Sequence, residues 1–135
     1  MMAARHLDSV ELFTGAGGVA LGLESTGWHH LGLIEKNEHA CETIRLNRER
    51  QHPLAKGWSL YPNDVRGIDY TRLFASVDMV AGGPPCQPFS LGGKHKAFRD
   101  GRDMFPQAVR AVRDMKPRCF VFENVRGLLR QSFAS

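Results

Sequence analysis

No apolar run in this sequence approaches the roughly 20 residues that a membrane-spanning helix needs. The longest such runs, residues 77–81 and 119–122, are much shorter. The N-terminal segment, residues 1–8, contains one arginine but no apolar stretch behind it, so it does not resemble a secretory signal. We therefore expect a cytoplasmic protein with no membrane partner.

The sequence also lacks the pattern of a disulfide-stabilised or metal-binding protein. Cysteine occurs three times, at Cys41, Cys86 and Cys119, and this odd number without paired spacing argues for a reducing compartment. The six histidines have no cysteine or histidine partners at the spacing of a zinc site, so we expect no metal. Repeats and low-complexity segments are missing as well, and a chain of 135 residues can bury one hydrophobic core.

Positive charge is in moderate excess. The formal net charge of +4 and the pI of about 9.3 are compatible with a nucleic acid partner, although this signal is weak by itself. Basic residues gather in residues 91–102, which include Lys94 and Arg99. This segment is suited to a mobile basic loop that closes over DNA, and a solvated surface turn is the alternative interpretation.

Short apolar runs alternate with segments of helical periodicity along the chain. This alternation predicts βαβ units and an α/β fold with a mostly parallel sheet flanked by helices. We expect strands at residues 9–13, 31–35, 57–64, 77–81 and 118–122, and helices at residues 19–26, 38–50 and 103–116. Candidate functional residues then follow the carboxyl ends of strands, where open α/β sheets bind ligands.

A glycine-rich turn follows the first predicted strand. Gly15, Gly17 and Gly18 tolerate positive φ and have no Cβ, so the backbone there can approach a ligand closely. The turn is a candidate cofactor cradle, and a tight strand-to-helix connection without a ligand is the alternative. Its spacing differs from the dinucleotide fingerprint G-x-G-x-x-G.

Two acidic residues are further candidates for the same site. Glu35 ends the second predicted strand, where a carboxylate can accept hydrogen bonds from a ribose diol. Asp64 can accept a hydrogen bond from an adenine amino group, or it can cap a turn. For Glu35 the alternative is a solvated carboxylate at the end of a strand.

The most specific signal is Cys86, which lies within Gly-Gly-Pro-Pro-Cys-Gln-Pro-Phe-Ser, residues 82–90. Turn-forming residues surround this cysteine directly after a buried strand, whereas Cys41 and Cys119 fall within an apolar helix and strand and are expected in the core. A thiol exposed to a cleft in this way is typical of a nucleophile.

Three blocks together resemble the first, fourth and sixth motifs of DNA cytosine-C5 methyltransferases, in order and in spacing. They are residues 13–18 (Phe-Thr-Gly-Ala-Gly-Gly), residues 82–90, and residues 123–125 (Glu-Asn-Val). The resemblance covers nearly the whole chain. It implies the Rossmann-like fold of S-adenosylmethionine-dependent methyltransferases and a methyl transfer to C5 of cytosine in double-stranded DNA.

The resemblance also implies roles for individual residues. Cys86 would add to C6 of a flipped-out cytosine, and Glu123 would hydrogen-bond the N3 and amino edge of that base. A strand-end carboxylate paired with an arginine is the alternative for Glu123. The implied S-adenosylmethionine contacts are Phe13, Gly15, Gly17, Glu35, Asp64 and, on the adenine side, Lys36, Val65 and Met104. The implied DNA contacts are Pro85, Gln87, Ser90, Lys94 and Arg99.

The chain departs from the family after Val125. The family's Gln-x-Arg-x-Arg block, target recognition domain and late motifs do not follow in residues 126–135. We therefore expect residues 1–135 to be the N-terminal part of a catalytic domain, with an unpaired apolar sheet edge. Such a chain is either one subunit of a split enzyme or a truncated product. A noncatalytic cofactor- or DNA-binding remnant and a tRNA cytosine-C5 methyltransferase are the alternatives.

Overall fold

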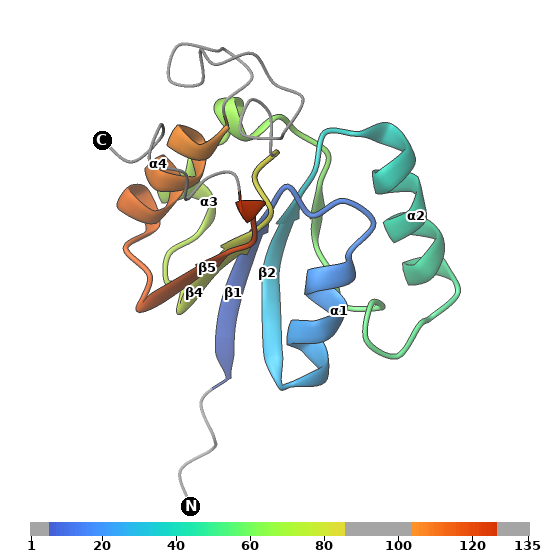
Figure 1. Cartoon of the computed structure of the whole chain (residues 1–135). Helices are drawn as coiled ribbons and strands as arrows, with labels where there is room; N and C mark the ends of the chain where they lie inside the picture. The colour runs from blue at the N-terminus through green and yellow to red at the C-terminus, as the bar shows by residue number, and fades with distance from the viewer. Residues whose placement is uncertain (1–5, 86–103, 127–135) are drawn as a thin grey trace, which may run out of the picture.

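The computed structural model describes residues 6–85 and 104–126 of the chain (Figure 1). A sheet with helices on both faces runs through this part. Its strands are β1 (Leu7–Leu12), β2 (Trp28–Ile34), β3 (Leu60–Tyr61), β4 (Met79–Gly82) and β5 (Cys119–Phe122). They pair in parallel in the order β3-β2-β1-β4-β5. The predicted parallel α/β sheet is therefore confirmed, with β3 shorter than expected.

The strand order changes direction at β1. Strands β2 and β3 lie on one side of β1, and β4 and β5 lie on the other. In open parallel sheets, ligands bind in the crevice that such a reversal leaves at the carboxyl ends of the strands. The segments that follow β1, β2 and β4 therefore begin at the edge of the sheet where a ligand is expected.

Helices α1 (Gly18–Ser25) and α2 (Glu38–Glu49) cover one face of the sheet, and α3 (Tyr70–Leu73) and α4 (Phe105–Met115) cover the other (Figure 1). Helix α2 begins where the Asn37 side chain accepts a hydrogen bond from the Ala40 N–H at 3.1 Å. The 3-10 helix at Val65–Gly67 and helix α3 are too short to show a periodic pattern, so the sequence did not predict them.

Alternate residues of the strands point into two hydrophobic cores. Val10, Leu12 and Ile34 pack with α4 on one face. Leu33, next to Ile34 in β2, points the opposite way and packs against α1 and α2. Because both faces are buried, the central strands cannot shift in register, and the strand ends that carry the site are fixed.

Strand β1 carries a buried carboxyl group, Glu11, near the centre of the sheet. The residue is 1% exposed, and its Oε2 has no hydrogen-bond partner among the described residues. Glu11 pairs with Leu33 on β2 and with Ala81 on β4. Because burial disfavours the charged form, it raises the pKa of Glu11 from 4.5 to about 8.

Strand β5 forms an edge of the described sheet, and several of its side chains are exposed to solvent. Phe120 is 58% exposed and Val121 is 57% exposed. The prediction that Cys119 lies in the core is wrong, because this residue is exposed at the beginning of β5. Cys41, by contrast, is fully buried in α2 as predicted. An apolar run identifies a strand but does not show whether a neighbouring element covers it.

Candidate cofactor and catalytic site

The turn between β1 and α1 has an unusual backbone. Phe13, Gly15 and Gly17 all have positive φ, at 54°, 58° and 94° respectively. Gly17 caps the N-terminus of α1, and its N–H donates a hydrogen bond to the Thr14 carbonyl at 3.1 Å. Positive φ is common for glycine but rare for an aromatic residue, so Phe13 is held in a strained conformation at the end of the central strand.

The Glu35 carboxylate fastens this turn to the end of β2. Its Oε2 accepts a hydrogen bond from the Gly15 N–H at 2.8 Å. Its Oε1 accepts from the N–H groups of Lys36 and Asn37, at 2.8 Å and 2.7 Å. Glu35 therefore organises the backbone at the carboxyl ends of two adjacent strands, in addition to any contact with a ligand.

The Asp64 carboxylate lies on the other side of the same region. It accepts hydrogen bonds from the Arg66 side chain, at 3.0 Å from Nε and 2.7 Å from Nη2, and from the Arg66 N–H at 3.0 Å. The Lys36 ammonium lies 3.5 Å away. These hydrogen bonds from Arg66, and the charges of both cations, hold the pKa of Asp64 well below its usual range.

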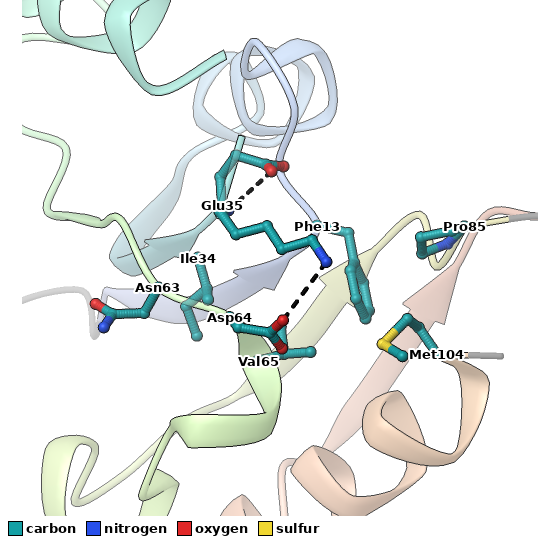
Figure 2. A pocket seen from close by; sticks show the side chains of 9 residues that line it. Phe13, Ile34, Glu35, Asn63, Asp64, Val65, Pro85 and Met104 are labelled. Atoms are coloured by element: carbon teal, nitrogen blue, oxygen red, sulfur yellow. Dashed lines mark hydrogen bonds and ion pairs between the residues drawn. The ribbon is translucent and has the colours of Figure 1, made fainter. Parts of the chain in front are cut away.

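One pocket lies at the carboxyl edge of the sheet, between the segments that carry Phe13, Glu35 and Asp64 (Figure 2). Its lining residues are Phe13, Ile34, Glu35, Lys36, Asn63, Asp64, Val65, Pro85 and Met104. The pocket includes Phe13, Glu35, Lys36, Asp64, Val65 and Met104 of the eight predicted cofactor contacts. The remaining two, Gly15 and Gly17, lie in the turn beside the pocket and do not line it. Six of the eight residues that the resemblance implies thus lie around one pocket, and their contact with a cofactor stays a prediction.

Three lining residues were not predicted as cofactor contacts. Ile34 and Asn63 directly precede Glu35 and Asp64, so their position next to a candidate was the available signal. Pro85 was predicted to contact DNA, and the structure places it in the wall of this pocket. Arg66, the main partner of Asp64, was also missed.

The ends of β4 and β5 meet next to this pocket. The Glu123 N–H donates a hydrogen bond to the Gly82 carbonyl at 3.0 Å, and the Asn124 side chain donates to the Pro84 carbonyl at 3.3 Å. A Cβ on Gly83 would lie 3.2 Å from Glu123 Oε2, so a glycine here leaves room for the carboxylate. Glu123 is exposed and is not paired with an arginine among the described residues.

The remaining predicted site residues are Cys86, Gln87, Ser90, Lys94 and Arg99, and they lie outside the described residues. Within residues 6–85 and 104–126, no group of three or more Asp, Glu, His or Cys side chains is arranged so that it could hold a metal ion. No helix in this part of the chain is long and apolar enough to cross a membrane.

Comparison with known protein families decides the assignment. The model of the C-5 cytosine-specific DNA methylase family matches residues 7–134. The chain belongs to this family. Two similar relatives are the type II methyltransferases M.PspPI of Psychrobacter sp. (strain TA137) and M.NgoMIV of Neisseria gonorrhoeae. They are 44% and 43% identical to the chain over 127 and 128 residues.

The C-5 cytosine-specific methylase chain matches these relatives over only part of their length. The matches cover 93% and 95% of this chain, but only 29% of M.PspPI and 38% of M.NgoMIV. The chain therefore spans about a third of the curated relatives it matches.

Solved structures confirm the Rossmann-like fold of this methylase family member. One of them is a prophage-encoded protein from E. coli, assigned as a DNA modification methyltransferase. It superimposes with a TM-score of 0.73 at 25% identity, and the match covers 95% of this chain and 34% of the E. coli chain. The S. pombe Dnmt2 methyltransferase superimposes with a TM-score of 0.62 at 24% identity, and the match covers 96% of this chain and 38% of the Dnmt2 chain.

Proposed function

We propose that residues 1–135 form the N-terminal part of the catalytic domain of a DNA (cytosine-5-)-methyltransferase. This part carries the pocket for S-adenosylmethionine and the nucleophile that attacks cytosine. The observation that supports the proposal most directly is the position of Pro85. This residue lines the pocket and directly precedes Cys86 in the chain, so one peptide bond connects the wall of the proposed cofactor site to the proposed nucleophile.

The pocket suits an adenosine-containing cofactor. Phe13, Val65 and Met104 offer an aromatic ring, a branched side chain and a thioether as apolar walls for a flat base. Glu35 Oε2 accepts one hydrogen bond from the described residues and keeps a lone pair that can accept from a ribose hydroxyl. The sulfonium group of S-adenosylmethionine supplies an electrophilic methyl group when the cofactor is bound.

Cys86 is proposed to make cytosine reactive. Cytosine C5 is too weak a nucleophile to take a methyl group directly. Addition of the Cys86 thiolate at C6 forms a C–S bond and gives an enamine-like base whose C5 is a stronger nucleophile. After methylation, loss of the C5 proton restores the C5–C6 double bond and breaks the bond to Cys86 Sγ, which leaves as a thiolate.

Glu123 is proposed to bind the cytosine during this addition. A carboxylic acid can share a proton with N3 and accept a hydrogen bond from the exocyclic amino group, which offsets the charge that develops in the ring. These atoms are inaccessible in a stacked duplex, so the base has to be flipped out at a cost of a few kcal/mol. The exposed position of Glu123 at the end of β5 is compatible with this role. Proposed DNA contacts are Pro85, Gln87, Ser90, Lys94 and Arg99.

Further parts are needed to read a DNA sequence. Since the chain spans only 29% and 38% of two relatives, we propose that a second chain or a continuation of this one supplies the target recognition domain. Those relatives are type II methyltransferases, so a restriction-modification role, in the cytoplasm where the DNA of a bacterial cell lies, is part of the proposal.

Transfer of labelled methyl groups from S-adenosylmethionine to cytosine-containing duplex DNA tests the activity. The chain is assayed alone and with lysate of its source organism, and tRNA serves as a parallel substrate. Transfer to DNA, alone or with lysate, supports the proposal, and dependence on lysate supports a separate partner. Transfer only to tRNA contradicts it, and so does a folded chain that binds no S-adenosylhomocysteine.

Covalent trapping by 5-fluorocytosine DNA tests the nucleophile under the conditions in which transfer occurs. The Cys86→Ala variant should form no adduct while keeping its affinity for S-adenosylhomocysteine. Cys119→Ala is the matched control, because Cys119 is an exposed thiol at the opposite end of the neighbouring strand. Trapping by Cys86→Ala, or its loss only in Cys119→Ala, would show that Cys86 is not the nucleophile.

A further inference from the structure

Trp58 packs directly against the glycine turn. It lies in the segment between α2 and β3, and it is 3% exposed. A Cβ placed on Gly17 would lie 2.8 Å from Trp58 Cζ3 and 3.3 Å from Cη2, both closer than ordinary contact. At Gly15, in contrast, nothing lies within 4 Å of such a Cβ. The indole ring therefore occupies the space behind Gly17 and supports the turn from the side of α2.

A hydrogen bond fixes the orientation of this ring. The Trp58 Nε1–H donates to Glu24 Oε2 at 3.2 Å. Glu24 is in the last turn of α1, the helix that begins after Gly17. The His30 ring meets the indole edge-on, with the ring centroids 5.9 Å apart. The indole is thus in contact with the start of α1 and tied to its end, and it cannot rotate without losing one of these interactions.

The backbone beyond Trp58 leads to the opposite wall of the pocket. The Ser59 carbonyl accepts a hydrogen bond from the Leu33 N–H at 2.9 Å, and β3 follows directly. Asn63, Asp64 and Val65 line the pocket two to four residues after β3. Trp58 therefore stands between two parts of the site, the glycine turn beside Phe13 and the segment that carries Asp64.

We infer that Trp58, oriented by Glu24, is a positioning residue that sets the glycine turn for binding of S-adenosylmethionine. The inference rests on the proposed function, since it names a further determinant of the same cofactor pocket. Packing alone does not account for the arrangement. Leu33, Ile44 and Ala55, the other buried members of this core outside α1, have apolar side chains that form no hydrogen bond to α1, whereas Trp58 donates one.

Calorimetric titration of the whole chain with S-adenosylhomocysteine tests the inference. Trp58→Phe keeps an aromatic ring but loses the N–H donor, and Glu24→Ala removes the acceptor from a half-buried side chain. Both variants should bind about tenfold more weakly, because a small displacement of a binding group has a large effect. Glu24→Gln, which retains an acceptor oxygen, should restore most of the affinity.

Leu33→Val is the matched control for loss of stability. Leu33 belongs to the same buried core but does not line the pocket. Amide hydrogen exchange at Gly17, whose N–H donates to the Thr14 carbonyl, gives a readout in the free protein. Exchange should accelerate in Trp58→Phe and Glu24→Ala more than in Leu33→Val at equal loss of global stability.

The outcomes separate this inference from the proposed function. If the native chain binds and both variants bind equally well, the inference alone is wrong. It is also wrong if Leu33→Val weakens binding as much as Glu24→Ala, or if Glu24→Gln behaves like Glu24→Ala. If the folded native chain does not bind S-adenosylhomocysteine, the proposed function fails and the inference fails with it.

Discussion

The side-chain amide of Asn124 donates a hydrogen bond to the main-chain carbonyl of Pro84 at 3.3 Å. This bond ties the segment after β5 to the segment after β4. Pro84 lies two residues before Cys86, and Asn124 directly follows Glu123. One hydrogen bond therefore links the parts of the chain that carry the two proposed catalytic side chains.

Replacing Asn124 should slow methyl transfer without weakening cofactor binding. In Asn124→Ala the Pro84 carbonyl loses its donor, and we expect the rate to fall by about tenfold because the reacting groups are less well aligned. Asn124→Asp has nearly the same size but no N–H, so it should behave in the same way. Initial rates and calorimetric affinity for S-adenosylhomocysteine check this. Full activity of Asn124→Asp would contradict it.

Gly83→Ala should act on the Glu123 carboxylate. The new Cβ would lie 3.2 Å from Glu123 Oε2, so the carboxylate has to move by a few tenths of an ångström. We expect slower transfer at an unchanged melting temperature. Gly82→Ala is the comparison: its Cβ would lie 2.4 Å from the Leu12 carbonyl oxygen, and this should cost about 1–3 kcal/mol of stability. Equal melting temperatures for both variants would contradict this distinction.

Glu35→Gln should weaken cofactor binding and destabilise the fold together. A glutamine has one acceptor oxygen, so its NH₂ group must face an N–H that the carboxylate now accepts from. We expect a loss of about 1–3 kcal/mol in the free energy of unfolding. Urea denaturation and calorimetry measure both effects. Glu42→Gln, at an exposed carboxylate on α2, is the control and should change neither the stability nor the affinity. An unchanged affinity in Glu35→Gln would show that Glu35 does not contact the cofactor.

The buried Glu11 should make the protein less stable as the pH rises. Its pKa is about 8 in the folded state and ordinarily 4.5, so between these values the folded state retains a proton that the unfolded state has lost. The free energy of unfolding should be highest below this range and fall by up to roughly 1.4 kcal/mol per pH unit through it. Urea denaturation across this range checks the slope. Glu11→Gln cannot ionise and should lack this decline; parallel curves would contradict the prediction.

Thiol labelling should distinguish the two described cysteines. In a Cys86→Ala background, Cys119 is exposed and should react rapidly with a maleimide. Cys41 is fully buried, and burial raises the pKa of its thiol, so it should react only after unfolding. Mass spectrometry of the native and denatured protein counts the labels. Labelling of Cys41 in the native protein would show that α2 opens readily.

The sheet and its main helices could be predicted because apolar periodicity distinguishes strands from helices within a short window. The exposure of Cys119 could not, because it depends on whether another element covers β5. The short elements that follow α2 could not be predicted from periodicity either. Pro62 limits β3, and the helical turns at Val65–Gly67 and Tyr70–Leu73 are set by the capping carboxylates of Asp64 and Asp69 rather than by an amphipathic pattern.

Parts of the candidate site could be predicted because their residues lie directly after predicted strands. The glycine turn, Glu35 and Asp64 all follow strands, and parallel strands bring their carboxyl ends to one edge. Contacts between distant segments carry no such signal. The ring of Trp58 approaches Gly17 from a distant part of the chain, and no spacing in the sequence indicates this contact.

Phe13 lines the pocket while its backbone is held at a φ of 54°. For a residue with a side chain, this conformation costs of order 1–3 kcal/mol, which the rest of the fold has to compensate. A glycine would relieve that strain but remove an aromatic wall of the pocket. A directed-evolution experiment that selected for thermal tolerance alone would therefore favour loss of this ring, and ligand binding would have to be part of the selection to retain it.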